Sequence, residues 1–331
     1  MTARVGIEGL SIGHFSDQAG MTGCTVVLAP QGVTASVDIR GGAPGTLETA
    51  LLSPHVSVPE LQAVLLTGGS ALGLGAAAGV STFLREGGYG YATLYSRVPL
   101  VSAAVIYDLG LGSSEAFPRP EDAYAAAASA GASVEEGSVG AGTGATVGKL
   151  LGRHGMMKGG IALSTVEIGG CVTVSALTVV NALGDVLDER GEVLAGARRD
   201  GAFVGSKDAL LSMCGMPAFG AVESTTLSVV MTDACLDKLQ CSIVARMSHD
   251  GFARAIDPVH TPVDGDCVFV LATGAKAGNV FQVGAAAAEA VSRSIRRAVR
   301  EARGLGGAPS VSDLAGGEDS AVTPMNAADI L

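Results

Sequence analysis

Three hydroxyl residues, Ser224, Thr225 and Thr226, stand directly before a run rich in apolar and β-branched residues, Leu227 to Met231. Such a run predicts a buried β-strand, with the hydroxyl residues at its start. Of the 331 residues, 48% are apolar and only 16% are charged, so much of the chain must lie inside a core. A chain of this length buries a large core as one domain or as two.

Charge and composition exclude several classes of partner. The net charge of −11 argues against nucleic acid as a partner. No run approaches the roughly 18 apolar residues of a membrane span, which argues against a membrane. Met1–Leu10 contains Arg4 and Glu8 and lacks the apolar core of a signal peptide. The six cysteines form no C-x-x-C pair and are expected to be reduced, so we expect a cytoplasmic protein.

Strand and helix patterns follow one another without strict alternation. This predicts an α+β domain with a sheet-on-sheet core and helices outside. An apolar stripe at Val291, Ile295, Ala298 and Ala302 has the helical period. Strands are expected at Cys24–Leu28 and Gly32–Ile39 (a hairpin around Pro30-Gln31-Gly32), Ala63–Thr67, Val98–Asp108, twice within Ile161–Leu187, at the Thr225 run and at Cys267–Ala272; helices at Ala71–Arg85, Pro120–Ala130, Cys235–Asp250 and Phe281–Arg303; an exposed connection at 189–220; and a disordered tail at 304–331 after a single domain at 1–303.

Thr225 has two interpretations. Threonine favours strands, and its hydroxyl caps neighbouring turns, so a structural role is the simpler interpretation. Alternatively, cleavage of the Ser224–Thr225 bond would place a free α-amine beside the Thr225 hydroxyl. That combination of nucleophile and base is the N-terminal threonine device of hydrolases.

Asp264 and Asp266 flank Gly265 directly before an apolar strand. They form either a turn or a carboxylate pair in which the pKa of one member is raised, suited to holding a hydroxyl or an ammonium. Lys149 ends a glycine-rich run and is either solvated or a buried cation near a site.

Two polar residues stand on or beside predicted strands. Asn181 is either a turn residue or an amide donor to an oxyanion. Tyr107 is a core tyrosine unless its hydroxyl serves a site.

Nucleotide and metal sites are not supported. Gly140–Ala145 matches a dinucleotide fingerprint, with Glu167 at a suitable spacing, but no apolar strand precedes it. The five histidines show no ligand spacing, so no metal is expected.

Several separated motifs, in order, resemble the DmpA-like family of self-processing aminopeptidases and amidases. That family includes L-aminopeptidase/D-esterases, β-peptidyl aminopeptidases and endo-type 6-aminohexanoate-oligomer hydrolases. The resemblance spans about Val5 to Arg303. Its most specific segments are Val37–Gly45, Leu66–Ala71, Ala104–Asp108 and Ser224–Leu227.

The resemblance implies a four-layer α-β-β-α sandwich of the N-terminal nucleophile hydrolase type, made as a precursor and cleaved into 1–224 and 225–331. It places the nucleophile at Thr225 and supporting carboxylates at Asp264 and Asp266. It implies no metal or organic cofactor, a small peptide, amide or ester substrate, and a homo-oligomer with a tetramer as the state it suggests. Asn181 and Tyr107 would contact the oxyanion, and Lys149 also falls at a site position.

The sequence departs from the family pattern at two positions. Ser224 stands where Asn or Gly is more usual, and Gly75 where Asp is more usual. Two alternatives to hydrolysis stay open. One is acyl transfer on the same scaffold, since an acyl-threonine can pass to an amine; the other is a non-processing relative that binds or assembles without catalysis, which Ser224 favours.

Overall fold

One eighteen-residue strand, β3 (Thr22–Ile39), belongs to both halves of the main sheet. The structure is a computed structural model, and it describes residues 2–213 and 223–314. The predicted hairpin around Pro30 is wrong, because the chain runs on in extended form there. Pairing with β5 (Leu61–Thr67) shifts register between Leu28 and Val33, where proline cannot donate a hydrogen bond. Each half of β3 finds its own partners, which a local turn signal cannot reveal.

The first half of the sheet has the order β12 (Gly160–Ile168), β13 (Val172–Asn181), β18 (Thr225–Cys235), β20 (Cys267–Ala277) and β3. Neighbours are antiparallel, except that β18 and β20 are parallel. The strand predicted to begin at Thr225 is therefore confirmed, and it lies inside the sheet.

The second half pairs the start of β3 with β2 (Ser11–Asp17) and β5. It continues through β8 (Val101–Val105) to β4 (Thr46–Leu47). All residues of β5 and β8 are buried, as expected for strands covered on both faces.

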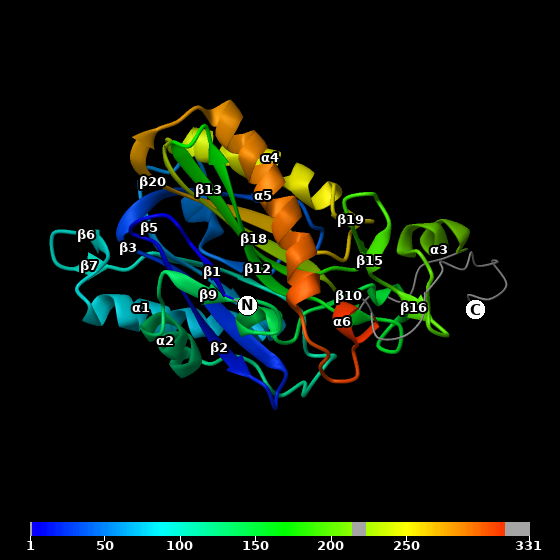
Figure 1. The fold of residues 1–331 in the computed structure, drawn as a ribbon. Coiled ribbons are helices and arrows are strands. Elements are labelled where there is room, and N and C mark those ends of the chain that lie inside the picture. The colour runs from blue at the N-terminus through cyan, green and yellow to red at the C-terminus, as the bar shows by residue number, and fades with distance from the viewer. Residues whose placement is uncertain (1, 214–222, 315–331) are drawn as a thin grey trace.

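Helices cover the outer face of each half (Figure 1). The helices α4 (Lys238–Ala253) and α5 (Val280–Glu301) pack on β12, β13 and β20, and α1 (Ala77–Glu86) and α2 (Pro120–Ala128) pack on the other half. The predicted stripe on the last helix is confirmed, because Val291, Ile295, Ala298 and Ala302 are all buried.

Three apolar layers result. One lies between α4, α5 and the first half-sheet, with Val244 and Val291. A second lies between the two half-sheets, with Leu177 and Val64, and a third below α1 and α2, with Val80. Burying each such side chain contributes about 1.5–3 kcal/mol, so these layers dominate the favourable side of folding. The predicted four-layer α-β-β-α sandwich is confirmed.

The remaining strands and helices are short. They are the strands β1 (Thr2–Arg4), β6 (Tyr91–Ala92), β7 (Arg97–Val98), β9 (Ser133–Glu135), β10 (Thr146–Val147), β11 (Met157–Lys158), β14 (Asp185–Leu187), β15 (Val193–Ala195), β16 (Arg198–Arg199), β17 (Ala202–Phe203) and β19 (Ile256–Asp257), the helices α3 (Ser206–Ser212) and α6 (Val311–Leu314), and the 3-10 helices Thr49–Leu52, Ser70–Ala76, Gly140–Gly142 and Lys149–Leu151.

Several boundaries differ from the prediction; for example, the strand expected at Val98–Asp108 covers only Val101–Val105. The helix expected at Ala71–Arg85 begins as 3-10 and becomes α-helical only at Ala77. The connection 189–220 contains β15, β16, β17 and α3, and its residues 214–220 lie outside the described part. The predicted disordered tail is wrong for residues 305–314, because Leu305 pairs with Ala308 and Ser310 is buried; its remainder lies outside the described residues.

Within residues 2–213 and 223–314, none of the helices combines the length and the apolar character that a bilayer span requires.

Candidate active site

Thr225 is the first residue of β18, which lies between β13 and β20 in the sheet. Its backbone pairs with Asn181, the last residue of β13, and two residues later β18 pairs with the start of β20. The residue is 5% exposed, and its Oγ1 donates a hydrogen bond of 2.6 Å to the Ser224 carbonyl oxygen. The hydroxyl thus lies against the peptide bond that precedes it.

The loop Asp264–Asp266 runs beside this peptide bond. Ser224 bridges to Asp264 in parallel fashion, and the Gly265 N–H donates to the Ser224 carbonyl oxygen at 2.8 Å. A Cβ on Gly265 would lie 2.7 Å from Thr225 Oγ1, closer than real Cβ contacts. Glycine at this position therefore allows the loop amide and the threonine hydroxyl to share one carbonyl oxygen.

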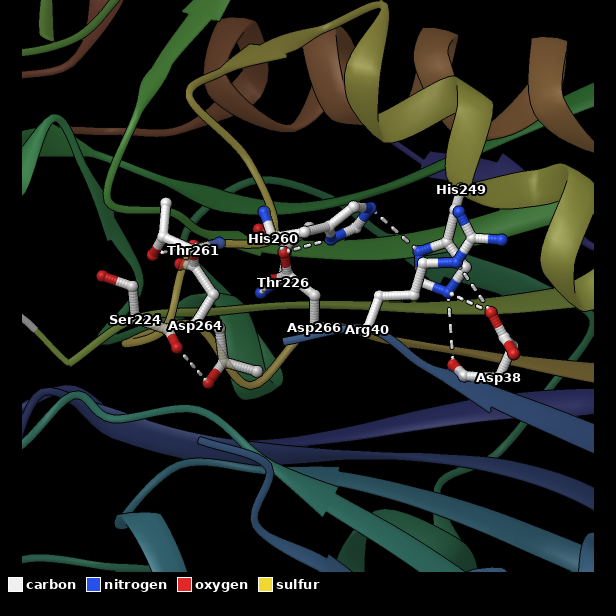
Figure 2. Close-up of polar contacts among 10 residues, drawn as sticks. Asp38, Arg40, Ser224, Thr226, His249, His260, Thr261, Asp264 and Asp266 are labelled. Carbon is white, nitrogen blue, oxygen red and sulfur yellow. Dashed lines mark hydrogen bonds and ion pairs between the residues drawn. The ribbon is translucent and has the colours of Figure 1, made fainter. Parts of the chain in front are cut away.

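The two loop carboxylates are buried and differently engaged (Figure 2). Asp264 Oδ2 accepts from the Thr261 N–H at 2.8 Å and the Thr261 hydroxyl at 2.6 Å. Asp266 Oδ1 accepts from the Thr226 N–H at 2.7 Å. Burial, and then the charge of Asp266, raise the pKa of Asp264 to about 6. Asp264 and Asp266 thus lie close together and buried, as the carboxylate-pair interpretation expects.

Lys149 is buried, which agrees with the buried interpretation and not with the solvated one. Its Nζ donates to Asn181 Oδ1 at 2.7 Å, the Asn181 carbonyl oxygen at 3.3 Å and the Glu223 carbonyl oxygen at 3.1 Å. Burial lowers the pKa of Lys149 to about 7, opposed by the charges of Asp264 and Asp108. Three acceptors match the three donors of an ammonium, which fixes the carbonyl two residues before Thr225.

Asn181 connects this cation to Tyr107. Its Oδ1 also accepts from the Thr146 N–H at 3.0 Å, and its Nδ2 donates to the Tyr107 carbonyl oxygen at 3.1 Å. The second hydrogen of the Nδ2 amide is left for another acceptor.

A pocket of about 110 Å³ opens beside Glu223 and Lys149. Leu111 and Met156 supply apolar walls, and Tyr107, Asp108 and Arg153 supply polar ones. This volume can hold a small side chain.

The structure thus brings together Thr225, Asn181, Lys149 and the two aspartates, and it places Tyr107 at the adjoining pocket. Sequence reasoning missed Gly265 as a backbone donor, although a glycine held between two aspartates was a signal. It also missed His260, whose Nδ1 lies 2.8 Å from Asp266 Oδ2, because histidines without ligand spacing carry no signal alone.

Among the described residues, no three His, Cys, Asp or Glu side chains gather in a metal-binding arrangement.

The fold has a solved counterpart in the L-aminopeptidase D-Ala-esterase/amidase of Ochrobactrum anthropi, described as a variant of the Ntn hydrolase fold. The TM-score is 0.66 at 19% identity, over 89% of this chain and 85% of that one. The fold is therefore that of the N-terminal nucleophile hydrolases.

Sequence comparison adds the family. The model for peptidase family S58 matches residues 5–311. An uncharacterised aminopeptidase of Mycobacterium bovis is 40% identical, over 95% of this chain and 98% of its own length. A 6-aminohexanoate-oligomer endohydrolase of Kocuria sp. is 32% identical, over 82% of this chain and 75% of its own. The chain belongs to peptidase family S58, which supports a peptide or amide hydrolase.

Proposed function

We propose that this chain is a self-processing amide hydrolase whose nucleophile is the Thr225 hydroxyl. The observation that carries the proposal is the double hydrogen bond on the Ser224 carbonyl oxygen, from Thr225 Oγ1 at 2.6 Å and from the Gly265 N–H at 2.8 Å. One donor is the nucleophile, and the other is placed to stabilise negative charge on that oxygen.

Processing then proceeds within residues 224 and 225. Thr225 Oγ1 attacks the Ser224 carbonyl carbon, and a five-membered tetrahedral adduct forms whose oxyanion accepts from the Gly265 N–H. The C–N bond breaks, and the hydroxyl proton ends on the nitrogen, which leaves an ester. Water hydrolyses this ester and releases a Ser224 carboxylate and a free Thr225 α-amine.

In turnover the free α-amine takes the hydroxyl proton, and Thr225 attacks a substrate carbonyl to give an acyl-enzyme that water releases. Asp264 and Asp266 orient the amine and hydroxyl. Asn181 and Tyr107 donate to the oxyanion, and Lys149 holds the Asn181 amide in place. The buried contacts of Lys149 and Asn181 support these roles.

The substrates we propose are small peptides, amino-acid amides or esters, and oligoamides. The pocket of about 110 Å³ beside Glu223 supports a small acyl group, because residues before Thr225 occupy the acyl side of the bond to be cut. The proposal needs no cofactor.

The proposal includes assembly as a homo-oligomer, with a tetramer as the candidate state, and a cytoplasmic location. Leu94 and Tyr95 on the projecting β6–β7 hairpin are 87% and 93% exposed, which supports subunit contacts (Figure 1). Light scattering of the purified protein measures the state.

Intact-mass spectrometry under denaturing conditions tests the nucleophile. The wild-type chain should give fragments 1–224 and 225–331, Thr225→Ser should still process, and Thr225→Ala should stay at 32.8 kDa and be inactive. A wild-type chain that stays intact for days, or a cleaved and active Thr225→Ala, would reject the proposal. The first outcome would favour a non-catalytic binding role.

A further inference from the structure

The imidazole rings of His260 and His249 meet edge to face beside Asp266, with their centroids 4.7 Å apart, and the proposed reaction makes no use of them (Figure 2). His260 Nδ1 lies 2.8 Å from Asp266 Oδ2, and His260 Nε2 lies 3.2 Å from Nδ1 of His249 on α4. His249 Nε2 in turn lies 3.2 Å from the Asp38 carbonyl oxygen and 3.4 Å from Asp38 Oδ2. A continuous polar chain therefore runs from Asp266 to strand β3.

The hydrogens along this chain can be counted with Asp266 taken as a carboxylate and each contact taken as a hydrogen bond. The ends are acceptors, so His260 Nδ1 and His249 Nε2 must each carry a hydrogen. The contact between the rings needs one more hydrogen, from either side. Two neutral imidazoles hold two ring hydrogens in total, whereas these contacts need three. On this count, the pair carries one positive charge.

The surroundings place that charge on His260. The His249 side chain is fully buried, and burial together with neighbouring His260 lowers the pKa of His249 to about 3. The His260 side chain is 18% exposed and faces the Asp266 carboxylate. The charged and titratable groups around the pair are Asp264 and Asp266 from the loop before β20, Asp38 and Arg40 from β3, and the histidines themselves; Arg40 is held by Asp38 Oδ2 at 2.9 Å.

The backbone of His260 is a second, independent observation. Its φ is 56°, in the left-handed region that residues other than glycine rarely adopt. Such conformations persist where the surrounding structure holds them, and they gather at functional sites. Here the conformation lets both the N–H, at 3.3 Å, and Nδ1 of His260 face Asp266 Oδ2.

We propose that protonated His260, backed by His249, is a positioning residue for Asp266. The inference rests on the proposed function, because Asp266 matters through its other oxygen, which accepts from the Thr226 N–H beside the nucleophile. Holding Oδ2 aims Oδ1 at Thr226. If the pair loses its extra proton, one contact has no hydrogen: either the two ring nitrogens face each other, or His260 Nδ1 faces the Asp266 carboxylate. Asp266 is therefore held less firmly at alkaline pH.

The first test is ¹⁵N NMR of the histidine rings in the full-length protein, with peaks assigned through His260→Asn and His249→Gln. At pH 6 we expect one imidazolium with two N–H groups, at His260, and one neutral ring with its hydrogen on Nε2, at His249. Two neutral rings at pH 6, or a charge on His249 alone, would overturn the proposal. This measurement needs no activity, so it decides the question even if Thr225 is not a nucleophile.

The second test compares three substitutions at His260 by kinetics. His260→Asn tolerates the left-handed backbone and puts an amide donor near the position of Nδ1, so it should keep most of kcat and lose the alkaline limb of the pH profile. His260→Gly relieves the backbone but removes the donor, so we expect about a tenfold lower kcat with KM little changed. His260→Ala should show the same kinetic loss together with lower stability.

His14→Asn is the matched control. His14 lies on β2 and is also hydrogen-bonded, with its Nδ1 2.8 Å from Thr25 Oγ1. It should leave the pH profile unchanged. A merely structural role for His260 predicts that His260→Gly keeps wild-type kcat and the alkaline limb, which would reject the positioning role. Processing-active protein with unchanged kinetics in all three variants would remove this proposal and leave the Thr225 mechanism intact.

Discussion

The backbone nitrogen of Gly265 lies 2.8 Å from the carbonyl oxygen of Ser224, so a loop amide already donates to the peptide bond that Thr225 would attack. A donor in this place need not move when charge develops on the oxygen, which is the condition for effective electrostatic stabilisation. The relationship depends on Gly265 having no side chain, since a Cβ would meet Thr225 Oγ1 at 2.7 Å and the Ala43 carbonyl oxygen at 2.9 Å.

Gly265→Ala should therefore slow processing by about 10²-fold or more, because the loop must withdraw and its amide leaves the Ser224 carbonyl. The rate is measured from the ratio of intact to cleaved mass over time. Gly75→Ala is the matched control: Gly75 is exposed, and an added Cβ would meet nothing within 4 Å. Wild-type processing in Gly265→Ala would show that this amide is dispensable.

Lys149→Met should uncouple stability from processing. Removing the ammonium leaves the Glu223 carbonyl without this donor, at a cost of about 1–3 kcal/mol, but it also abolishes the burial of a charge. We expect these effects to offset largely in the unfolding free energy, while processing slows because the Glu223 segment and Asn181 amide lose their anchor.

Lys158→Met is the comparison for Lys149. Lys158 is also fully buried, and its Nζ donates to the carbonyl oxygens of Thr143 at 2.8 Å and Ala145 at 2.6 Å. Because those carbonyls belong to a packed turn, this variant should lose more stability in urea unfolding, while its folded fraction still processes. A larger loss of stability in Lys149→Met than in Lys158→Met, with normal processing in Lys149→Met, would contradict the assigned roles.

Tyr107→Phe should separate turnover from processing. If the hydroxyl donates to the oxyanion of the substrate, its loss lowers kcat about 10²–10³-fold with little change in KM. Cleavage after Ser224 should continue, because that carbonyl has the Gly265 amide. Tyr124→Phe serves as control, since the Tyr124 hydroxyl bonds to Glu86 on the surface at 2.6 Å. Equal kcat in both variants would remove Tyr107 from the mechanism.

Stability should depend on pH through Asp264. Burial raises its pKa from the usual 3.8 to about 6, so between these values the folded protein binds a proton that the unfolded chain has released. Its contribution is therefore complete below about pH 4 and is lost as the pH rises through about 6.

The measurement is the unfolding free energy of wild type minus that of Asp264→Asn, determined by denaturant titration from pH 4 to 7. The difference should fall with rising pH, whereas Asp250→Asn, at an exposed position, should give a flat difference. A difference that rises over this range would mean that Asp264 is stabilised as a carboxylate.

The layers could be predicted from the sequence, and the loops could not. The stripe from Val291 to Ala302 shows which face of the helix is buried, and the apolar run after Thr225 indicates a buried strand. The pattern alone therefore predicts helices packed on the outside of a sheet core. In contrast, Pro30-Gln31-Gly32 is a valid turn signal that the pairing of β3 overrides. Only the partners of each half of β3 decide this, and they lie far away in sequence.

The same distinction holds at the site. Asn181 and Lys149 were recognisable as polar residues set among apolar or uncharged neighbours. The Gly265 amide and the His260 ring depend on how residues 258–266 return beside Ser224, and a single sequence does not encode such a loop path in any local pattern.

The strand order has a last consequence for a chain opened between residues 224 and 225. Strands β18 and β20 would belong to the shorter piece, yet they lie between β13 and β3 of the longer one. The two pieces would thus be interleaved within a single sheet and bound by its ladders on both flanks. They should copurify as one particle under native conditions and separate only when the whole sheet melts, so nicking would create a heterodimer that cannot exchange its halves.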